Sequence, residues 1–196
     1  MSHYADRFTV LIDANCLAGA LRRNMILSLA EAGFYRVRWS ARIMDETARA
    51  IDTITGGKAD SSKQIDAMTR AFPEATVEDF EELERLLIDG GLRDVGDAHV
   101  IAAAIKCGAS VIVTDNLRDF PEKTLKPLGL EAQGSDGFIA DCIDLDNAQA
   151  MAALNKMRLR FKHPELTWDA ICQKVEAQGL TQSASMMQKF SDLFRE

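Results

Sequence analysis

One segment constrains the fold more than any other, Leu92–Pro121, with the sequence LRDVGDAHVIAAAIKCGASVIVTDNLRDFP. Within it, Asp97–Cys107 is apolar on nearly every side, as expected of a helix that packs on a sheet. Gly108 stands where a left-handed residue ends a helix, and Ser110–Thr114 is a short β-branched run. Such a run predicts a strand buried on both faces, as in parallel sheets. The segment therefore predicts an α/β fold.

Strand and helix patterns alternate through the first three quarters of the chain. Phe8–Ile12 predicts a buried first strand, and Val37–Trp39 predicts a second. Apolar residues with helical spacing follow at Leu17–Ala32 and at Ala41–Ile54, and Ser40 is a suitable N-cap for the latter. Further helices are predicted near residues 63–72, 78–88 and 136–143, and an edge strand near 130–133.

From Asn147 onward the pattern is helical only, with Thr167 as an N-cap and Gly179 as a helix stop. We therefore expect a three-layer α/β domain at residues 1–145, in which helices flank a central parallel sheet. An all-helical C-terminal extension is expected at residues 146–196.

Size and composition fit a cytoplasmic protein. With 196 residues, 47% of them hydrophobic, the chain is long enough to bury a sizeable core. No apolar run approaches the roughly 20 residues that cross a bilayer, and the first residues lack the apolar segment of a secretory signal. The four cysteines match no metal-binding or redox spacing, so we expect reduced thiols and no membrane association.

The formal net charge of −7 argues against a protein that coats nucleic acid through bulk positive charge. It does not argue against an enzyme that acts on nucleic acid through metal ions. In such an enzyme, part of the negative charge belongs to the metal site.

Acidic side chains gather at one edge of the predicted sheet. Asp13 directly follows the first strand, and Asp115 follows the strand predicted at Ser110–Thr114. Asp97 begins the buried helix predicted at Asp97–Cys107. Ligands of open α/β sheets bind at this carboxyl edge. Each aspartate alone also fits a turn or a helix cap, so the conjunction carries the interpretation. Polar residues close to these acids in sequence are Asn15, Asp94, Thr114, Asn116 and Asp119.

Glu46 is the glutamate that helix geometry favours. The inward face of the helix 41–54 is predicted to consist of Ile43, Thr47, Ala50 and Ile54. Glu46 borders this face and can reach the sheet edge, whereas Asp45 points outward. A solvated glutamate at the boundary of the helix face is the alternative.

Carboxylates that converge without histidine or cysteine suit a hard cation with oxygen ligands, Mg²⁺ or Mn²⁺. The cation offsets the repulsion between the acids. Mg²⁺ held in this way keeps water molecules, and one of them can attack a phosphodiester. Asn15 is suited to donate a hydrogen bond to Asp13 or to such a water.

Other chemistries have little support in the sequence. His99 follows Asp97 by two residues, about 200° around the helix, so we expect it to face elsewhere. No G-x-S-x-G, Walker or G-x-G-x-x-G pattern occurs. Acyl transfer, ATP hydrolysis and dinucleotide chemistry are therefore disfavoured.

Four pieces of the sequence resemble the PIN-domain family, in particular its VapC-like toxin ribonucleases. They are VLIDANCL, WSARIMDETARAI, LRDVGDAHVIAAAI and VTDNLRDFP, and they occur in family order across Val10–Pro121. The resemblance implies a Mg²⁺-dependent endonuclease that cuts single-stranded RNA. It also implies a homodimer and a cognate antitoxin whose C-terminal segment enters the site.

The resemblance implies that the acids of the site are Asp13, Glu46, Asp97 and the turn from Asp115 to Asp119. Gly96 departs from the family pattern, which often has another acid there, and Asp94 is the nearby substitute. Whether Asp115 or Asp119 completes the site stays open.

A basic run in the C-terminal extension is a candidate for contact with RNA phosphates. It consists of Lys156, Arg158, Arg160 and Lys162. The alternative is a solvated helix face balanced by the acidic helix near residues 78–88.

Three functions follow from these patterns. A metal-dependent endoribonuclease, the toxin of a type II toxin–antitoxin pair, is the favoured one. A PIN fold that no longer cuts and binds RNA or protein is the alternative. A phosphatase-like hydrolase that uses the same metal is the third. Metal-dependent RNA cleavage by the purified protein distinguishes among them.

Overall fold

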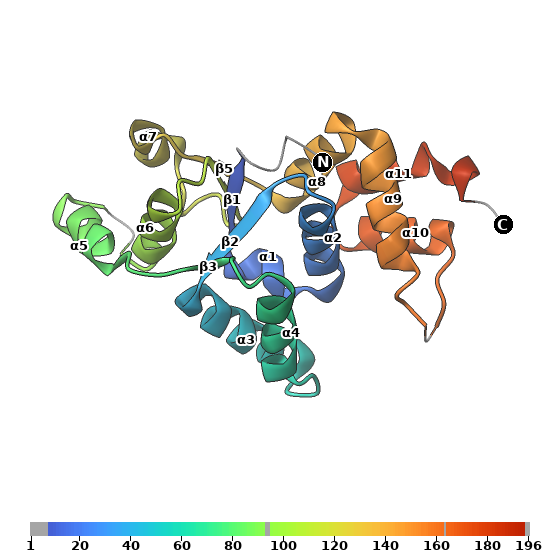
Figure 1. Ribbon diagram of the computed structural model, residues 1–196, viewed down its shortest axis with the longest axis horizontal. Coiled ribbons are helices and arrows are strands. Elements are labelled where there is room, and N and C mark those ends of the chain that lie inside the picture. The colour runs from blue at the N-terminus through green and yellow to red at the C-terminus, as the bar shows by residue number, and fades with distance from the viewer. Residues whose placement is uncertain (1–7, 93–94, 163, 195–196) are drawn as a thin grey trace. The chain divides into compact units, whose positions relative to one another are not determined.

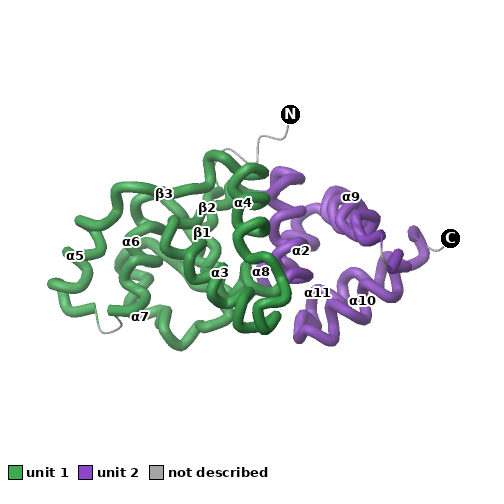
Figure 2. Tube along the Cα trace, turned by 90° about the horizontal axis from the view of Figure 1, so that it is seen from below, with its two compact units in different colours: residues 1–19, 35–134 green, residues 20–34, 135–196 purple. Residues whose placement is uncertain are grey.

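The structure, a computed structural model, describes residues 8–92, 95–162 and 164–194. The chain divides into two compact units (Figure 2). Unit 1 comprises Met1–Gly19 and Tyr35–Gly134, and unit 2 comprises Ala20–Phe34 and Ser135–Glu196. Both units are discontinuous in sequence, and the domain boundary expected after residue 145 stays a prediction.

Unit 1 is built on a five-stranded parallel sheet with the order β3-β2-β1-β4-β5. Strands β1, β2, β3 and β5 of this sheet are labelled in Figure 1. The strands are β1 Thr9–Ile12, β2 Arg36–Ser40, β3 Thr76–Val77, β4 Val111–Val113 and β5 Glu131–Gln133. Strands β2 and β3 lie on one side of β1, and strands β4 and β5 lie on the other. The carboxyl ends of β1 and β4 therefore form a topological switch point, where α/β sheets bind ligands.

Helices flank this sheet, as the sequence predicts. The helices of unit 1 are α1 Ala14–Ala18, α3 Ala41–Thr55, α4 Ser61–Ala71, α5 Glu81–Asp89, α6 Ala98–Lys106, α7 Glu122–Leu125 and the 3-10 turn η1 Lys126–Leu128. Helix α6 packs against β1, β2 and β4, and its residues from Ala98 to Ala104 are all buried. Gly108 ends it with φ +65°, and β4 is buried throughout. Helix α6, its end at Gly108 and strand β4 thus form as predicted.

Helix α3 begins where predicted, because the Ser40 hydroxyl accepts a hydrogen bond from the backbone N–H of Ile43 at 3.2 Å. Its buried face consists of Ile43, Met44, Thr47 and Ile51. The prediction that Ile54 points inward is wrong, since this side chain is 68% exposed. Ile54 lies in the last turn, beyond the part of α3 that the core covers.

Two local features differ from the sequence prediction. The single helix expected at Leu17–Ala32 is two helices, α1 and α2, because Gly19 adopts an extended conformation with φ −77° and ψ 118°. Glycine is a weak helix former, so the break falls there. Strand β3 was not predicted, since its two residues are too few to show a periodic pattern.

Unit 2 is helical. Its elements are α2 Ala20–Glu31, α8 Ser135–Leu145, α9 Asn147–Arg158, α10 Trp168–Ala177, α11 Thr181–Gln188 and the 3-10 turn η2 Ser191–Leu193. Helix α2 packs against α8 and α9, and α10 packs against α11. Thr167 caps α10 as predicted, and the buried Trp168 donates its indole N–H to the Met187 carbonyl at 3.2 Å.

None of the four cysteines, all of which lie in described segments, forms a disulfide, as predicted. Burial raises the pKa of the Cys142 thiol to about 12 and that of Cys172 to about 11. Both therefore stay protonated at neutral pH and are poor nucleophiles. Across the described ranges, no helix has both the length and the apolar character that a membrane crossing requires.

Candidate active site

The carboxylate of Asp13 lies at the switch point. Ile12 at the end of β1 pairs with Val113 at the end of β4, so Asp13 and Thr114 follow neighbouring strand ends. The Thr114 hydroxyl donates to Asp13 Oδ2 at 2.7 Å, and the backbone N–H of Ala14 donates to Oδ1 at 2.7 Å. Both side chains are buried. Asp13 is thus fixed in orientation by groups from two strands.

Asn15 joins the turn after β1 to the loop after β4. Its Nδ2 donates to Asp13 Oδ2 at 2.6 Å and to Thr114 Oγ1 at 2.9 Å. Its Oδ1 accepts from the backbone N–H of Asp115 and from the Cys16 thiol, both at 3.1 Å. The sequence-based expectation that Asn15 would hydrogen-bond Asp13 is therefore met in the structure.

The loop after β4 carries the remaining acids of this edge. The backbone N–H of Asn116 donates to Thr114 Oγ1 at 3.1 Å, and the Asn116 amide donates to Asp119 Oδ2. Asp115 is exposed and Asp119 is half-buried. The loop thus presents two carboxylates beside the end of β4.

The carboxylates of this edge repel one another. Burial raises the pKa of Asp13, and the negative charges of Asp115 and Asp119 raise it further. Hydrogen bonds from Thr114 and Ala14 act in the opposite direction. Burial is the main cause of the raised pKa of Asp13, and the negative charges of the two loop acids add to it.

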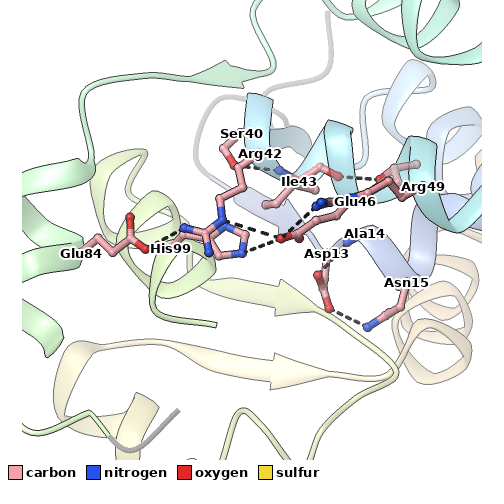
Figure 3. A network of polar contacts seen from close by, with 11 residues as sticks. Asp13, Ala14, Asn15, Ser40, Arg42, Ile43, Glu46, Arg49, Glu84 and His99 are labelled. Atoms are coloured by element: carbon pink, nitrogen blue, oxygen red, sulfur yellow. Dashed lines mark hydrogen bonds and ion pairs between the residues drawn. The ribbon is translucent and has the colours of Figure 1, made fainter. Parts of the chain in front are cut away.

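Glu46 reaches the same edge from α3 (Figure 3). Burial raises its pKa, Arg42 opposes that rise, and the charge of Asp13 adds to it. Its Oε1 lies 3.7 Å from Arg42 Nε and 3.9 Å from Arg49 Nη2. The half-buried position that helix geometry predicted for Glu46 is the one observed, whereas Asp45 is exposed.

His99 lies beside one of these acids, which was not predicted from the sequence. Its Nε2 lies 3.3 Å from Glu46 Oε1, although the sequence predicts only that it turns away from Asp97 (Figure 3). Arg42 extends the same network, because its Nη1 donates to Glu84 Oε1 at 2.9 Å. Helix periodicity carries no signal for such a contact, since the contact depends on where α6 and α3 lie around the sheet.

Asp97 occupies the N-cap position of α6 and is half-buried. Its side chain makes no capping hydrogen bond to the helix, so helix capping does not explain its presence. Asp94, the substitute acid considered from sequence, lies outside the described residues.

The donor chemistry of this edge fits a divalent cation. Asp13, Glu46 and the loop acids offer oxygen atoms, as Mg²⁺ and Mn²⁺ prefer, and their mutual repulsion is what a cation would offset. In the parts of the chain that the structure describes, no three acidic, histidine or cysteine side chains are close enough to hold a metal. Mg²⁺ is commonly bound by one or two carboxylates together with water molecules, so a site at this edge does not require three protein ligands.

Comparison with known proteins identifies the fold family. A family model described as "PIN domain" matches residues 9–118, more than half of the chain. The chain belongs to the PIN-domain family. A second family model, described as "VapC50 C-terminal domain", matches residues 135–189. The resemblance noted from the sequence motifs is therefore confirmed.

One curated relative of this PIN-domain protein is "Putative ribonuclease VapC50" of Mycobacterium tuberculosis strain H37Rv. The two sequences are 39% identical over 71 residues, which cover 36% of this chain and 42% of the relative. The alignment thus spans less than half of the relative's length. No solved structure gives a significant match.

Outside the PIN motifs, most residues of the basic run in unit 2 form contacts with other residues of the same chain. Lys156 Nζ lies 3.0 Å from Glu31 Oε1, and Arg160 Nη2 lies 2.7 Å from Glu31 Oε2. Arg158 is buried and donates to the Leu166 carbonyl at 2.6 Å, whereas Lys162 is exposed. Glu31 of α2 thus balances two of the four basic residues of this run. Contact of the run with RNA stays a prediction.

Glu31 makes the stability of unit 2 dependent on pH. Hydrogen bonds from Arg160 and Lys156 hold the pKa of Glu31 below its ordinary value of 4.5. Such a carboxylate stabilises the fold above its unfolded-state pKa, and this contribution is lost as the pH falls through its folded-state pKa.

We expect Glu31→Gln to lower the free energy of unfolding by less than about 1 kcal/mol at neutral pH, because solvent screens the pair. The difference from wild type should vanish in acid. Urea unfolding at a series of pH values measures it. If the difference in unfolding free energy between Glu31→Gln and wild type widened as the pH falls, Glu31 would not stabilise unit 2 as an ionised carboxylate.

Proposed function

We propose that this PIN-domain protein is a divalent-metal-dependent endoribonuclease that hydrolyses phosphodiester bonds in RNA. The observation that carries the proposal is the placement of several acids around the switch point between β1 and β4. Asp13, Glu46 and the loop acids act on one another there electrostatically, and their donor atoms are all oxygen. The PIN-domain match and the name of the curated relative support a ribonuclease.

In this proposal, Asp13, Glu46 and Asp97 bind the cation, Mg²⁺ or Mn²⁺, and Asp115 or Asp119 completes the site. The bound cation supplies a water of lowered pKa as the nucleophile and neutralises charge that develops on the phosphodiester. A carboxylate binds a cation in its ionised form. In this scheme the acids therefore act as ionised metal ligands.

The neighbouring polar groups of the chain orient these ligands. Thr114 and Asn15 both donate to Asp13 Oδ2, so they fix the direction of that carboxylate. Asn116 does the same for Asp119 through its amide. Hydrogen bonds of this kind keep a carboxylate in a productive orientation before the substrate arrives.

We further propose that the protein is the toxin of a type II toxin–antitoxin pair, with a cognate antitoxin protein and a homodimeric assembly. The family resemblance and the match of residues 135–189 to the VapC50 C-terminal domain support this part of the proposal. Lys156, Arg160 and Lys162 remain candidates for RNA contact, whereas the buried guanidinium of Arg158 already holds the Leu166 carbonyl.

The test is cleavage of single-stranded RNA by the purified full chain with Mg²⁺ or Mn²⁺, beside Asp97→Asn. Wild type should cut, EDTA should stop the reaction, and Asp97→Asn should slow it roughly a hundredfold or more. Asp66→Asn, a matched change on the exposed surface of α4, should cut like wild type.

Two outcomes would favour the other functions. Folded wild type that binds no metal and cuts no RNA, including total cellular RNA, would favour the catalytically inactive binding module. Hydrolysis of small phosphoesters without any RNA cleavage would favour a phosphatase-like hydrolase.

A further inference from the structure

We infer that His99 is a positioning residue that holds the Glu46 carboxylate in place at the acidic edge of the sheet. The inference rests on the proposed function, because it assigns the role of Glu46 to that site. It is carried by the contact between the two side chains, in which His99 Nε2 lies 3.3 Å from Glu46 Oε1. Figure 3 shows the imidazole and the carboxylate facing each other between α6 and α3.

Among the described residues that contact Glu46, His99 is the most firmly held. Its side chain is 1% exposed, whereas those of Arg42 and Arg49 are 47% and 73% exposed. The arginine contacts are also longer, at 3.7 and 3.9 Å, and Arg42 is shared with Glu84. Exposed pairs between long side chains are screened by water and lose conformational entropy, so they fix a partner weakly. The buried imidazole fixes it well.

The hydrogen-bonding state of His99 fits this role. The imidazole directs Nε2 toward Glu46 Oε1, so an N–H on that nitrogen can donate to the carboxylate. A neutral imidazole has a single N–H, which must lie on Nε2 to donate to Glu46. Nδ1 is then a bare acceptor, and it is buried with no hydrogen-bond partner among the described residues.

An unpaired buried acceptor destabilises a fold, and an apolar residue would fill the same space without that penalty. The contact with Glu46 is therefore the interaction that a leucine at position 99 would not provide. All three neighbours meet Glu46 at Oε1. Without His99, we expect the carboxylate to rotate toward the exposed arginines and away from Asp13.

Two substitutions distinguish the effect of the N–H donor of His99 from the effect of its side-chain volume. His99→Gln keeps an N–H donor close to the position of Nε2, and His99→Leu fills the space without a donor. Loss of an outer hydrogen bond to a metal ligand reduces metal affinity or activity about 10–100-fold, which is the loss expected for His99→Leu. His99→Gln should recover most of it.

The readouts are Mn²⁺ affinity by titration calorimetry, the initial rate of RNA cleavage, and thermal unfolding. Val100→Ala is the matched control, since it removes buried volume from the next position of α6. It should lower the unfolding temperature without lowering Mn²⁺ affinity. His99→Leu should lower Mn²⁺ affinity even at temperatures where it is fully folded.

A double-mutant cycle with Glu46→Gln tests whether His99 acts through Glu46. If it does, His99→Leu adds no further loss of Mn²⁺ affinity in the Glu46→Gln background. Additive losses would overturn the inference, and so would equal Mn²⁺ affinities of His99→Leu and wild type. Wild type that binds Mn²⁺ but cuts no RNA would overturn the proposed function instead, while the Mn²⁺ affinities would still decide the role of His99.

Discussion

The Asp13→Asn variant is expected to lose metal-dependent RNA cleavage while remaining folded. The substitution removes the negative charge at the meeting point of β1 and β4, but it keeps an oxygen that can accept from the N–H of Ala14. Loss of a ligand that contributes several kcal/mol through the cation corresponds to a rate reduction of roughly a thousandfold. Mn²⁺ affinity should fall with the rate, and both are measured on the same preparation.

Asp45→Asn is the matched control for this prediction. It makes the same change of charge on α3, one residue from Glu46, but Asp45 is exposed. Its rate and its Mn²⁺ affinity should stay near those of wild type. If Asp13→Asn bound Mn²⁺ and cut RNA as well as Asp45→Asn, Asp13 would not be a metal ligand.

The second large effect is expected for Asn15→Ala. Asn15 donates to Asp13 and Thr114, and it accepts from the backbone N–H of Asp115 and from Cys16. Its removal takes away hydrogen bonds to the buried side chains of Asp13, Thr114 and Cys16, and we expect this to lower the free energy of unfolding by about 1–3 kcal/mol. The Asp13 carboxylate loses a hydrogen bond that orients it, so the cleavage rate should fall about 10–100-fold.

Urea unfolding and initial rates measured under fully folding conditions separate these two effects. Asn147→Ala, a similar change at the start of α9, should alter the free energy of unfolding by less than about 0.5 kcal/mol and leave the rate unchanged. The positioning role of Asn15 would be refuted if Asn15→Ala were less stable but cut RNA at the wild-type rate.

Features encoded by short stretches of sequence could be predicted. The buried helix α6 and strand β4 follow from apolar and β-branched runs, and Ser40 shows its capping role by its residue type. Acids at strand ends can also be located from sequence, because a parallel sheet brings its carboxyl ends to one edge. This is why Asp13 and Thr114 could be placed together before the structure was known.

Features that depend on packing could not be predicted. The contact between His99 and Glu46 depends on where α6 and α3 lie around the sheet, and no local pattern encodes that distance. The same holds for Glu31, which lies far in sequence from the cations it pairs with in α9 and beyond. The break at Gly19 was missed because the apolar spacing continues across it, and that spacing outweighed the low helix propensity of one glycine.

The central claim is that the carboxylates at the ends of β1 and β4 bind a divalent cation. Anomalous scattering from crystals of the full chain soaked in Mn²⁺ tests it most directly, because the Mn²⁺ position is then observed. We predict a peak in contact with Asp13 and with Glu46 or Asp97, and its third neighbour would show whether Asp115 or Asp119 completes the site. A peak elsewhere, or none at Mn²⁺ concentrations that support cleavage, would contradict the claim.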